Sequence, residues 1–217
     1  MEMTIAEELV LLAYREDTGR PLIGSGELDA ALGGAMLAEL TVLRRLDLAG
    51  RKVTVLDATP TGDPELDAAL ARIAGDRERR PETWVAKLQS ADVRKRLLAR
   101  LVERRVLSER TSKVLGLFTT RSYPEADPTA ERAVRERVGD VLRGAEPDAR
   151  VAVLIGVLHA CKLDRKVFPE ADKRRVKEVV EGQWAGPAVA KAIAAANAAI
   201  MAAITAATVT SATTAGN

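Results

Sequence analysis

Apolar positions recur at helical spacing along most of the chain. Leu28, Leu32, Met36, Leu40 and Leu43 follow one another at intervals of four and three residues, which predicts a helix with one face in the core. The same reasoning predicts helices that end near residue 14, that begin at the Asp-Pro pairs of residues 63–64 and 127–128, and that cover 91–105, 128–143, 148–161, 169–182 and 187–206. Thr4 and Glu7 form the Thr-x-x-Glu pattern of a capping box in front of the first helix.

Two segments carry a β pattern instead. The stretch LDLAGRKVTVLD alternates in polarity around Ala49-Gly50 and predicts a short hairpin. The stretch RRVLSERTSKVLGLFTT predicts a second hairpin, with strands over 105–107 and 114–119 and a turn over 108–112. Leu115, Leu117 and Phe118 would place apolar groups on both faces of its second strand. Because an isolated two-stranded hairpin is marginal in water, we expect it to dock on the domain, on another copy or on a membrane.

Composition favours one helical domain. The 217 residues are 47% hydrophobic but only 3% aromatic, and much of the apolar count is alanine, so helices are expected to pack through small residues. Without an internal repeat or a long linker, the sequence predicts a mainly α, single compact domain over residues 1–208 and a disordered tail over 209–217. The Ala-rich stretch 192–209 is expected to be a packed terminal helix, since a membrane span needs about 20 strongly apolar residues.

The cellular setting is inferred from the cysteine count and the N-terminus. Cys161 is the only cysteine, so no intrachain disulfide can form and a reducing, cytoplasmic setting is expected. No basic region precedes the first apolar run, which is unlike a secretory signal.

Charge is distributed unevenly. Residues 1–70 hold six basic and thirteen acidic residues (net −7), whereas residues 87–113 hold nine basic and three acidic residues (net +6). On the helix predicted over 91–105, Arg96, Arg100 and Arg104 recur at every fourth position, where like charges repel, and Arg94 lies on an adjoining face. Guanidinium groups bind phosphate well, so the pattern predicts an anion site at Arg94, Arg96 and Arg100. A merely solvated helix face stays open as the alternative.

The sequence offers few residues that are typical of an enzyme active site. The single histidine, His159, lies in an apolar helix, where a core role is the commoner reading, and Cys161 beside it reads as a small buried group. The sequence has no Gly-rich phosphate loop, no metal-ligand cluster and no nucleophile elbow. We therefore expect no catalytic residues, no metal and no cofactor.

Nucleic-acid binding is a second alternative, because a basic helix followed by a hairpin is also the pattern of a winged helix. Only Gln89 and Ser90 near the start of the helix could contact base edges, and an apolar wing suits phosphate contacts poorly. Nucleic acid is therefore disfavoured. A protein-interaction scaffold without lipid binding is the third possibility.

Several motifs occur together in one order: MTIAEELVLLAYREDTGRPL, GGAMLAELTVLRRL, PTGDPELDAAL, TWVAKL, VRKRLLARLVERRVL and KVLGLFTTRSYPEAD. In this respect the chain resembles the Golgi phosphoprotein 3 family over residues 3 to about 205. The resemblance implies a helical domain with a protruding β-hairpin, and self-association through hairpin residues Val114, Leu115, Leu117 and Phe118. It also implies a peripheral membrane adaptor that binds phosphatidylinositol 4-phosphate and client proteins.

The resemblance also implies positions for the lipid pocket. Lipid-binding members of the family use a Trp, an Arg and two further basic residues, and these positions fall at Gly24, Gly33, Ala91 and Arg94 here. Only Arg94 keeps the expected residue type. The Ala and Arg bias suggests a bacterial, actinobacterial member. The sequence therefore predicts a cytoplasmic homo-oligomer that binds an anionic lipid or phosphoinositide headgroup at the inner face of the membrane.

Overall fold

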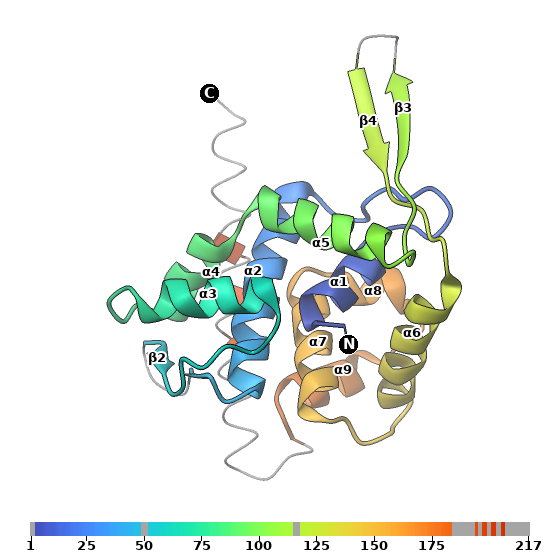
Figure 1. Ribbon diagram of the computed structural model, residues 1–217. Helices are drawn as coiled ribbons and strands as arrows, with labels where there is room; N and C mark the ends of the chain where they lie inside the picture. Colours follow the sequence, from blue (N-terminus) through green and yellow to red (C-terminus); the bar gives the residue numbers. More distant parts are fainter. Residues whose placement is uncertain are drawn as a thin grey trace, which may run out of the picture.

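The computed structural model describes residues 3–48, 52–114 and 118–183, together with positions 194, 197, 198, 201, 202, 205 and 206. The elements in these ranges are α1 (Ile5–Ala13), α2 (Ser25–Val42), β1 (Leu46–Asp47), β2 (Thr54–Val55), α3 (Pro64–Ala74), α4 (Pro81–Leu88), α5 (Ala91–Glu103), β3 (Arg110–Val114), β4 (Phe118–Ser122), α6 (Pro128–Leu142), α7 (Ala149–Ala160), α8 (Asp164–Val167) and α9 (Lys173–Val180). The prediction of a mainly helical chain with two small hairpins is confirmed (Figure 1).

Helix α2 is the centre of the domain. It contacts α1, α3, α4, α5 and α7, and every residue from Leu28 to Leu40 is buried. The expectation of a single core face was therefore wrong for this helix. Alanines and glycines fill the positions between the large residues, so neighbouring helices can cover α2 on all sides, as a helix buried all round requires.

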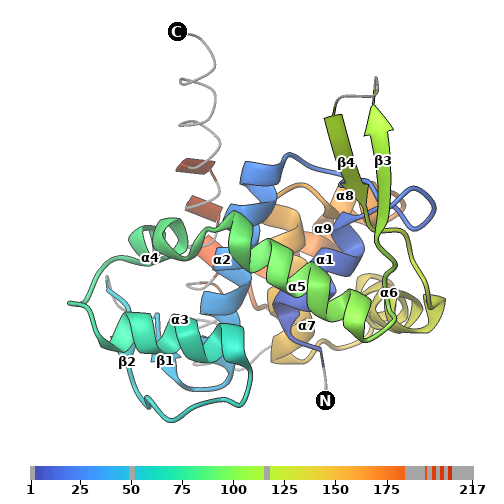
Figure 2. The ribbon, with the colours of Figure 1, turned by 45° about the horizontal axis from the view of Figure 1, so that its top comes forward.

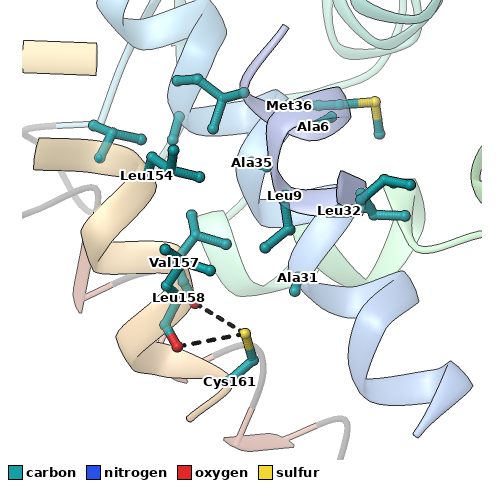
Figure 3. Packing of buried hydrophobic residues seen from close by; sticks show 14 of the residues in the cluster. Ala6, Leu9, Ala31, Leu32, Ala35, Met36, Leu154, Val157, Leu158 and Cys161 are labelled. Atoms are coloured by element: carbon teal, nitrogen blue, oxygen red, sulfur yellow. Dashed lines mark hydrogen bonds between the residues drawn. The ribbon is translucent and has the colours of Figure 1, made fainter. Parts of the chain in front are cut away.

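Small residues do mediate the closest packing, as the composition predicts. Ala6, Ala31 and Ala35 lie where α1, α2 and α7 meet, between larger side chains such as Leu9 and Leu154 (Figure 3). Gly33 shows the same principle in its strongest form. A Cβ at this position would lie 2.9 Å from the backbone oxygen of Val85, so α2 and α4 approach closely only because the residue is glycine.

The predicted helix starts are present. Thr4 and Glu7 form the capping box of α1, with the Thr4 amide donating to the Glu7 carboxylate at 2.8 Å. Asp63 caps α3 and Asp127 caps α6, and each is followed by proline at the first helical position. The helix predicted over 169–182 is present as α9 with narrower bounds, and the short α8 before it was not predicted.

The first hairpin is confirmed, with Leu46 opposite Val55, whereas the second has a different register from the one expected. Strand β3 pairs antiparallel with β4, and Val114 faces Phe118. The predicted turn over 108–112 was therefore wrong: Arg110, Thr111 and Ser112 are in a strand. Apolar content misled the prediction here, because the paired strands consist mainly of Thr, Ser, Lys and Arg, and β-branched threonine suits an exposed strand well.

The β3–β4 hairpin projects from the body in both views (Figures 1 and 2). Its base is held by the loop between α1 and α2, where the Tyr123 amide donates to the Gly19 oxygen at 2.9 Å. Gly19 has φ +62, and a Cβ there would lie 2.1 Å from the Pro124 nitrogen, so glycine is required at this crossing. Tyr14 and Tyr123 add an edge-to-face contact at 6.0 Å between ring centroids.

The C-terminal predictions fall mostly outside the described residues. The tail over 209–217 lies outside them, and only seven positions of the helix expected over 187–206 are described. One of these, Asn197, is buried and donates to the Val180 oxygen at 2.8 Å. Within the described part of the chain, no helix is long and apolar enough to span a bilayer.

Candidate anion-binding site

Helix α5 carries the arginines that the sequence singles out, and it packs on α1 and α2. Ser90 caps the helix by accepting from the Asp92 amide at 3.2 Å. Leu97, Leu98 and Leu101 form its buried face. The arginines at 94, 96, 100 and 104 therefore lie along the sides of this buried face, at the seam with the neighbouring elements.

Arg94 is the most enclosed of them. Its Nε donates to Asp29 Oδ1 at 2.6 Å and its Nη2 to Asp29 Oδ2 at 3.4 Å, and the two side chains are 19% and 10% exposed. Tyr14 completes this group from the end of α1. Burial raises the pKa of the Tyr14 hydroxyl, while a hydrogen bond and the charge of Arg94 lower it in part.

Arg96 and Arg100 also meet carboxylates of other elements. Arg96 forms a two-point pair with Glu65 of α3, at 2.6 and 2.9 Å, and its side chain is 56% exposed. Arg100 lies between two acids: its Nε is 2.9 Å from Glu7 Oε1 and its Nη1 is 2.6 Å from Asp63 Oδ2. Glu7 is buried and is shared with Arg104 at 3.3 Å.

The acids that pair with this stripe were missed at the sequence level, although the sequence contains a sign of them. Glu7, Asp29, Asp63 and Glu65 all belong to the first 70 residues, whose net charge of −7 balances the +6 of residues 87–113. The repulsion between arginines that suggests an external anion is thus compensated inside the fold. Anion binding by Arg94, Arg96 and Arg100 stays a prediction, and a ligand there would have to displace a carboxylate.

The other positions of the implied lipid pocket supply no charge. Gly24 is exposed at the start of α2 with open space around it, and Ala91 is exposed at the start of α5. Gly33 is packed against the α4 backbone, so no side chain could stand there without moving α4. Arg94 is the only cation of the four implied positions.

The residues expected in self-association are only partly covered. Val114 and Phe118 are the last pair of the β3–β4 ladder, and Leu115 and Leu117 lie outside the described residues. The described strand residues on either side, including Lys113 and Thr119, are exposed except for the half-buried Ser122. Self-association through Val114, Leu115, Leu117 and Phe118 stays a prediction.

His159 and Cys161 mark the end of α7. His159 was expected to lie in the core, but its side chain is 32% exposed. Its Nδ1 lies 2.7 Å from Asp164 Oδ2. Cys161 is fully buried, and its thiol donates to the Val157 oxygen at 3.1 Å (Figure 3). Burial raises the pKa of the thiol to about 12, so it is protonated and unreactive at neutral pH.

Comparison with known proteins gives one family. The sequence profile of the Golgi phosphoprotein 3 (GPP34) family matches residues 5–196. The chain is similar to the vacuolar protein sorting-associated protein 74 of Eremothecium gossypii, with 27% identity over 163 residues, and to the protein of that name in Schizosaccharomyces pombe, with 26% identity over 163 residues. These matches cover 64% of this chain but 49% and 48% of the relatives, so the chain spans about half of their length.

Proposed function

Because the chain belongs to the Golgi phosphoprotein 3 family, we propose that it is a peripheral membrane adaptor that binds an anionic lipid headgroup and self-associates through its β3–β4 hairpin. The observation that carries the proposal is the family match over residues 5–196 on a fold in which a hairpin leaves the helical body. The name that the two relatives share refers to vacuolar protein sorting, which supports a role in recruiting client proteins. A bacterial origin stays a prediction.

The arginines of α5 set the expected strength of membrane binding. A cation near an anionic surface contributes about 1 kcal/mol, and the contribution falls with salt. Arg96 can contribute most readily, because its side chain is more than half exposed, whereas Arg94 must first release the enclosed Asp29. We therefore expect weak, reversible and salt-sensitive binding by one copy. A phosphomonoester headgroup can compete with Asp29 better than a singly charged lipid, because it brings more negative charge to Arg94.

Self-association through the hairpin would strengthen this binding. Two linked copies present two lipid sites to one surface, and the second site then binds at a high effective concentration. Among the described residues, β3 and β4 pair only with each other, so an added strand from another copy would satisfy the backbone groups at their outer edges.

Vesicle flotation tests the lipid proposal. The protein is mixed with neutral vesicles, with vesicles containing phosphatidylserine, and with vesicles containing phosphatidylinositol 4-phosphate. Arg94→Ala alone would leave Asp29 as an unpaired carboxylate in an enclosed position, so the informative variant is Asp29→Asn with Arg94→Gln, which removes both charges. Arg165→Ala removes one exposed cation of α8 and is the control for nonspecific attraction to an anionic surface.

The outcomes separate the remaining readings. Flotation with the phosphoinositide that the double variant loses and Arg165→Ala keeps would support binding at Arg94. Equal flotation with any anionic lipid would indicate a nonspecific basic surface. A protein that never floats would favour the scaffold without lipid binding. The winged-helix alternative is disfavoured, because the α5 arginines at 94, 96 and 100 are paired with acids and would have to give up these pairs to contact nucleic-acid phosphates.

A further inference from the structure

A second group of cationic side chains lies at the connection between α3 and α4. An open hollow of about 530 Å³ is lined there by Lys52, Arg77, Glu78, Arg79, Arg80 and Thr83. The connection and α4 are on the side of the molecule away from the β3–β4 hairpin in both views (Figures 1 and 2). None of these residues belongs to the positions that the family resemblance implies for a lipid pocket.

Two of the arginines differ from those of α5 in forming no ion pair with a described acid. The guanidinium groups of Arg77 and Arg80 are exposed and make no hydrogen bond or ion pair with any described residue. The Arg77 amide donates to Asp76 Oδ1, but this contact involves only the backbone. These two guanidinium groups are therefore available to a ligand without the loss of an internal contact.

Arg79 is oriented by its neighbours. Its Nε and Nη2 donate to the two oxygens of Asp76 at 2.9 and 3.0 Å, which fixes the plane of the guanidinium group. Lys87 also donates to Asp76, at 2.7 Å, and the hydrogen bonds from Arg79 and Lys87 hold the pKa of this carboxyl far below its usual range. The backbone is fixed as well, because the Val53 amide donates to the Arg79 oxygen at 2.8 Å.

The balance of charge in the hollow is positive. Lys52, Arg77, Arg79 and Arg80 contribute four positive charges, and Asp76 and Glu78 contribute two negative charges, which leaves a net charge of +2. Glu78 is the only acidic side chain in the lining, and its pair with Lys52 is long, at 3.9 Å, and solvent-exposed on both sides. A phosphate monoester carries between one and two negative charges at neutral pH and accepts several hydrogen bonds, so it matches this hollow in charge and in hydrogen-bonding groups.

We propose that the hollow between Lys52 and the Arg77–Arg80 segment is a binding site for a terminal phosphate group, held by Arg77 and Arg80 together with Arg79. The volume leaves room for the group that carries the phosphate, and the Thr83 hydroxyl at the rim can donate to it. The same phosphate could belong to a lipid headgroup or to a free phosphomonoester. The site does not depend on the proposed lipid-binding function, because a free phosphate in solution would occupy it as well.

The test is calorimetric titration of the full chain with pyrophosphate and with glycerol 3-phosphate, followed by flotation with vesicles containing phosphatidic acid. The variant is Arg77→Ala with Arg80→Ala, which removes two exposed and unpaired side chains and should leave the fold intact. The matched control is Arg165→Ala with Arg174→Ala, which removes the same charge from exposed positions of α8 and α9.

We expect the protein to bind pyrophosphate, the Arg77/Arg80 variant to lose roughly tenfold or more in affinity, and the Arg165/Arg174 variant to change by less than about twofold. Binding of glycerol 3-phosphate would assign a free phosphomonoester. Capture by phosphatidic acid vesicles alone, lost in the same variant, would assign a lipid headgroup. The proposal is overturned if both double variants weaken binding equally, or if the wild-type protein binds neither phosphate probe nor the vesicles.

Discussion

The arginines of α5 and those of the α3–α4 connection are both clustered along the chain, but they differ in whether they pair with carboxylates. On α5, Arg94, Arg96 and Arg100 each pair with a carboxylate from an element distant in sequence. In the connection, the side chains of Arg77 and Arg80 meet no described acid. A cluster of cations therefore indicates an anion site only where some of its members form no internal ion pair. The α5 arginines stabilise the domain, whereas Arg77 and Arg80 of the connection are available to bind a ligand.

Arg100→Ala against Arg77→Ala tests this difference most strongly. Removal of Arg100 leaves the buried Glu7 and the capping residue Asp63 short of a partner, and we expect the free energy of unfolding to fall by about 3 kcal/mol. Removal of Arg77 should change it by no more than about 0.5 kcal/mol. Urea unfolding followed by circular dichroism measures both. If the two variants lose equal stability, the α5 pairs contribute no more than surface charges and the contrast is wrong.

Gly33→Ala should displace α4, the helix that follows the Arg77–Arg80 segment. The added Cβ would lie 2.9 Å from the Val85 oxygen and 3.1 Å from the Gln89 nitrogen, both backbone atoms that cannot swing aside. We expect a loss of about 2 kcal/mol in the free energy of unfolding, as for overpacked cores. Gly24→Ala is the matched control, since nothing lies within 4 Å of its added methyl group. Equal stability of the two variants would show that α4 is free to shift.

The parts of this fold that sequence predicts are those set by local chemistry. The Thr4–Glu7 capping box and the Asp caps of α3 and α6 depend on residues three or fewer positions apart, and all are present. The fully buried surface of α2 and the acids beside α5 depend instead on which distant segments meet. The pair between Arg94 and Asp29 joins residues 65 positions apart, and no local pattern encodes it. The prediction of the second hairpin's register was also wrong, because its polar strands have no alternation of apolar residues that would fix the register.

Glu131 lies between these two situations, because it shares its arginine partner, Arg135, with a second acid. Arg135 lies 2.7 Å from buried Glu131 and 2.9 Å from Glu16, and Glu125 adds negative charge nearby. Burial raises the pKa of Glu131 to about 7, so between pH 4.5 and 7 the folded state binds more protons than the unfolded state. Stability therefore falls as pH rises through this window. Relative to Glu131→Gln, we expect the wild-type free energy of unfolding to drop by about 1 kcal/mol from pH 5 to pH 8. A rise over the same range would mean that the charge of Arg135 outweighs the burial of Glu131 and lowers its pKa.

Arg96→Ala gives the smallest effect and separates stability from binding. Its pair with Glu65 has good two-point geometry, but the arginine side chain is 56% exposed, and such surface pairs contribute about 0.5 kcal/mol. The variant should therefore unfold almost as the wild-type protein does. If the α5 face binds anionic vesicles, flotation of Arg96→Ala should weaken, because this is the arginine that can exchange its carboxylate for a headgroup most easily. Arg77→Ala removes the same charge from the connection and is the control. Unchanged flotation of Arg96→Ala, with weaker flotation of Arg77→Ala, would place the membrane contact at the α3–α4 connection and assign the α5 arginines to the fold alone.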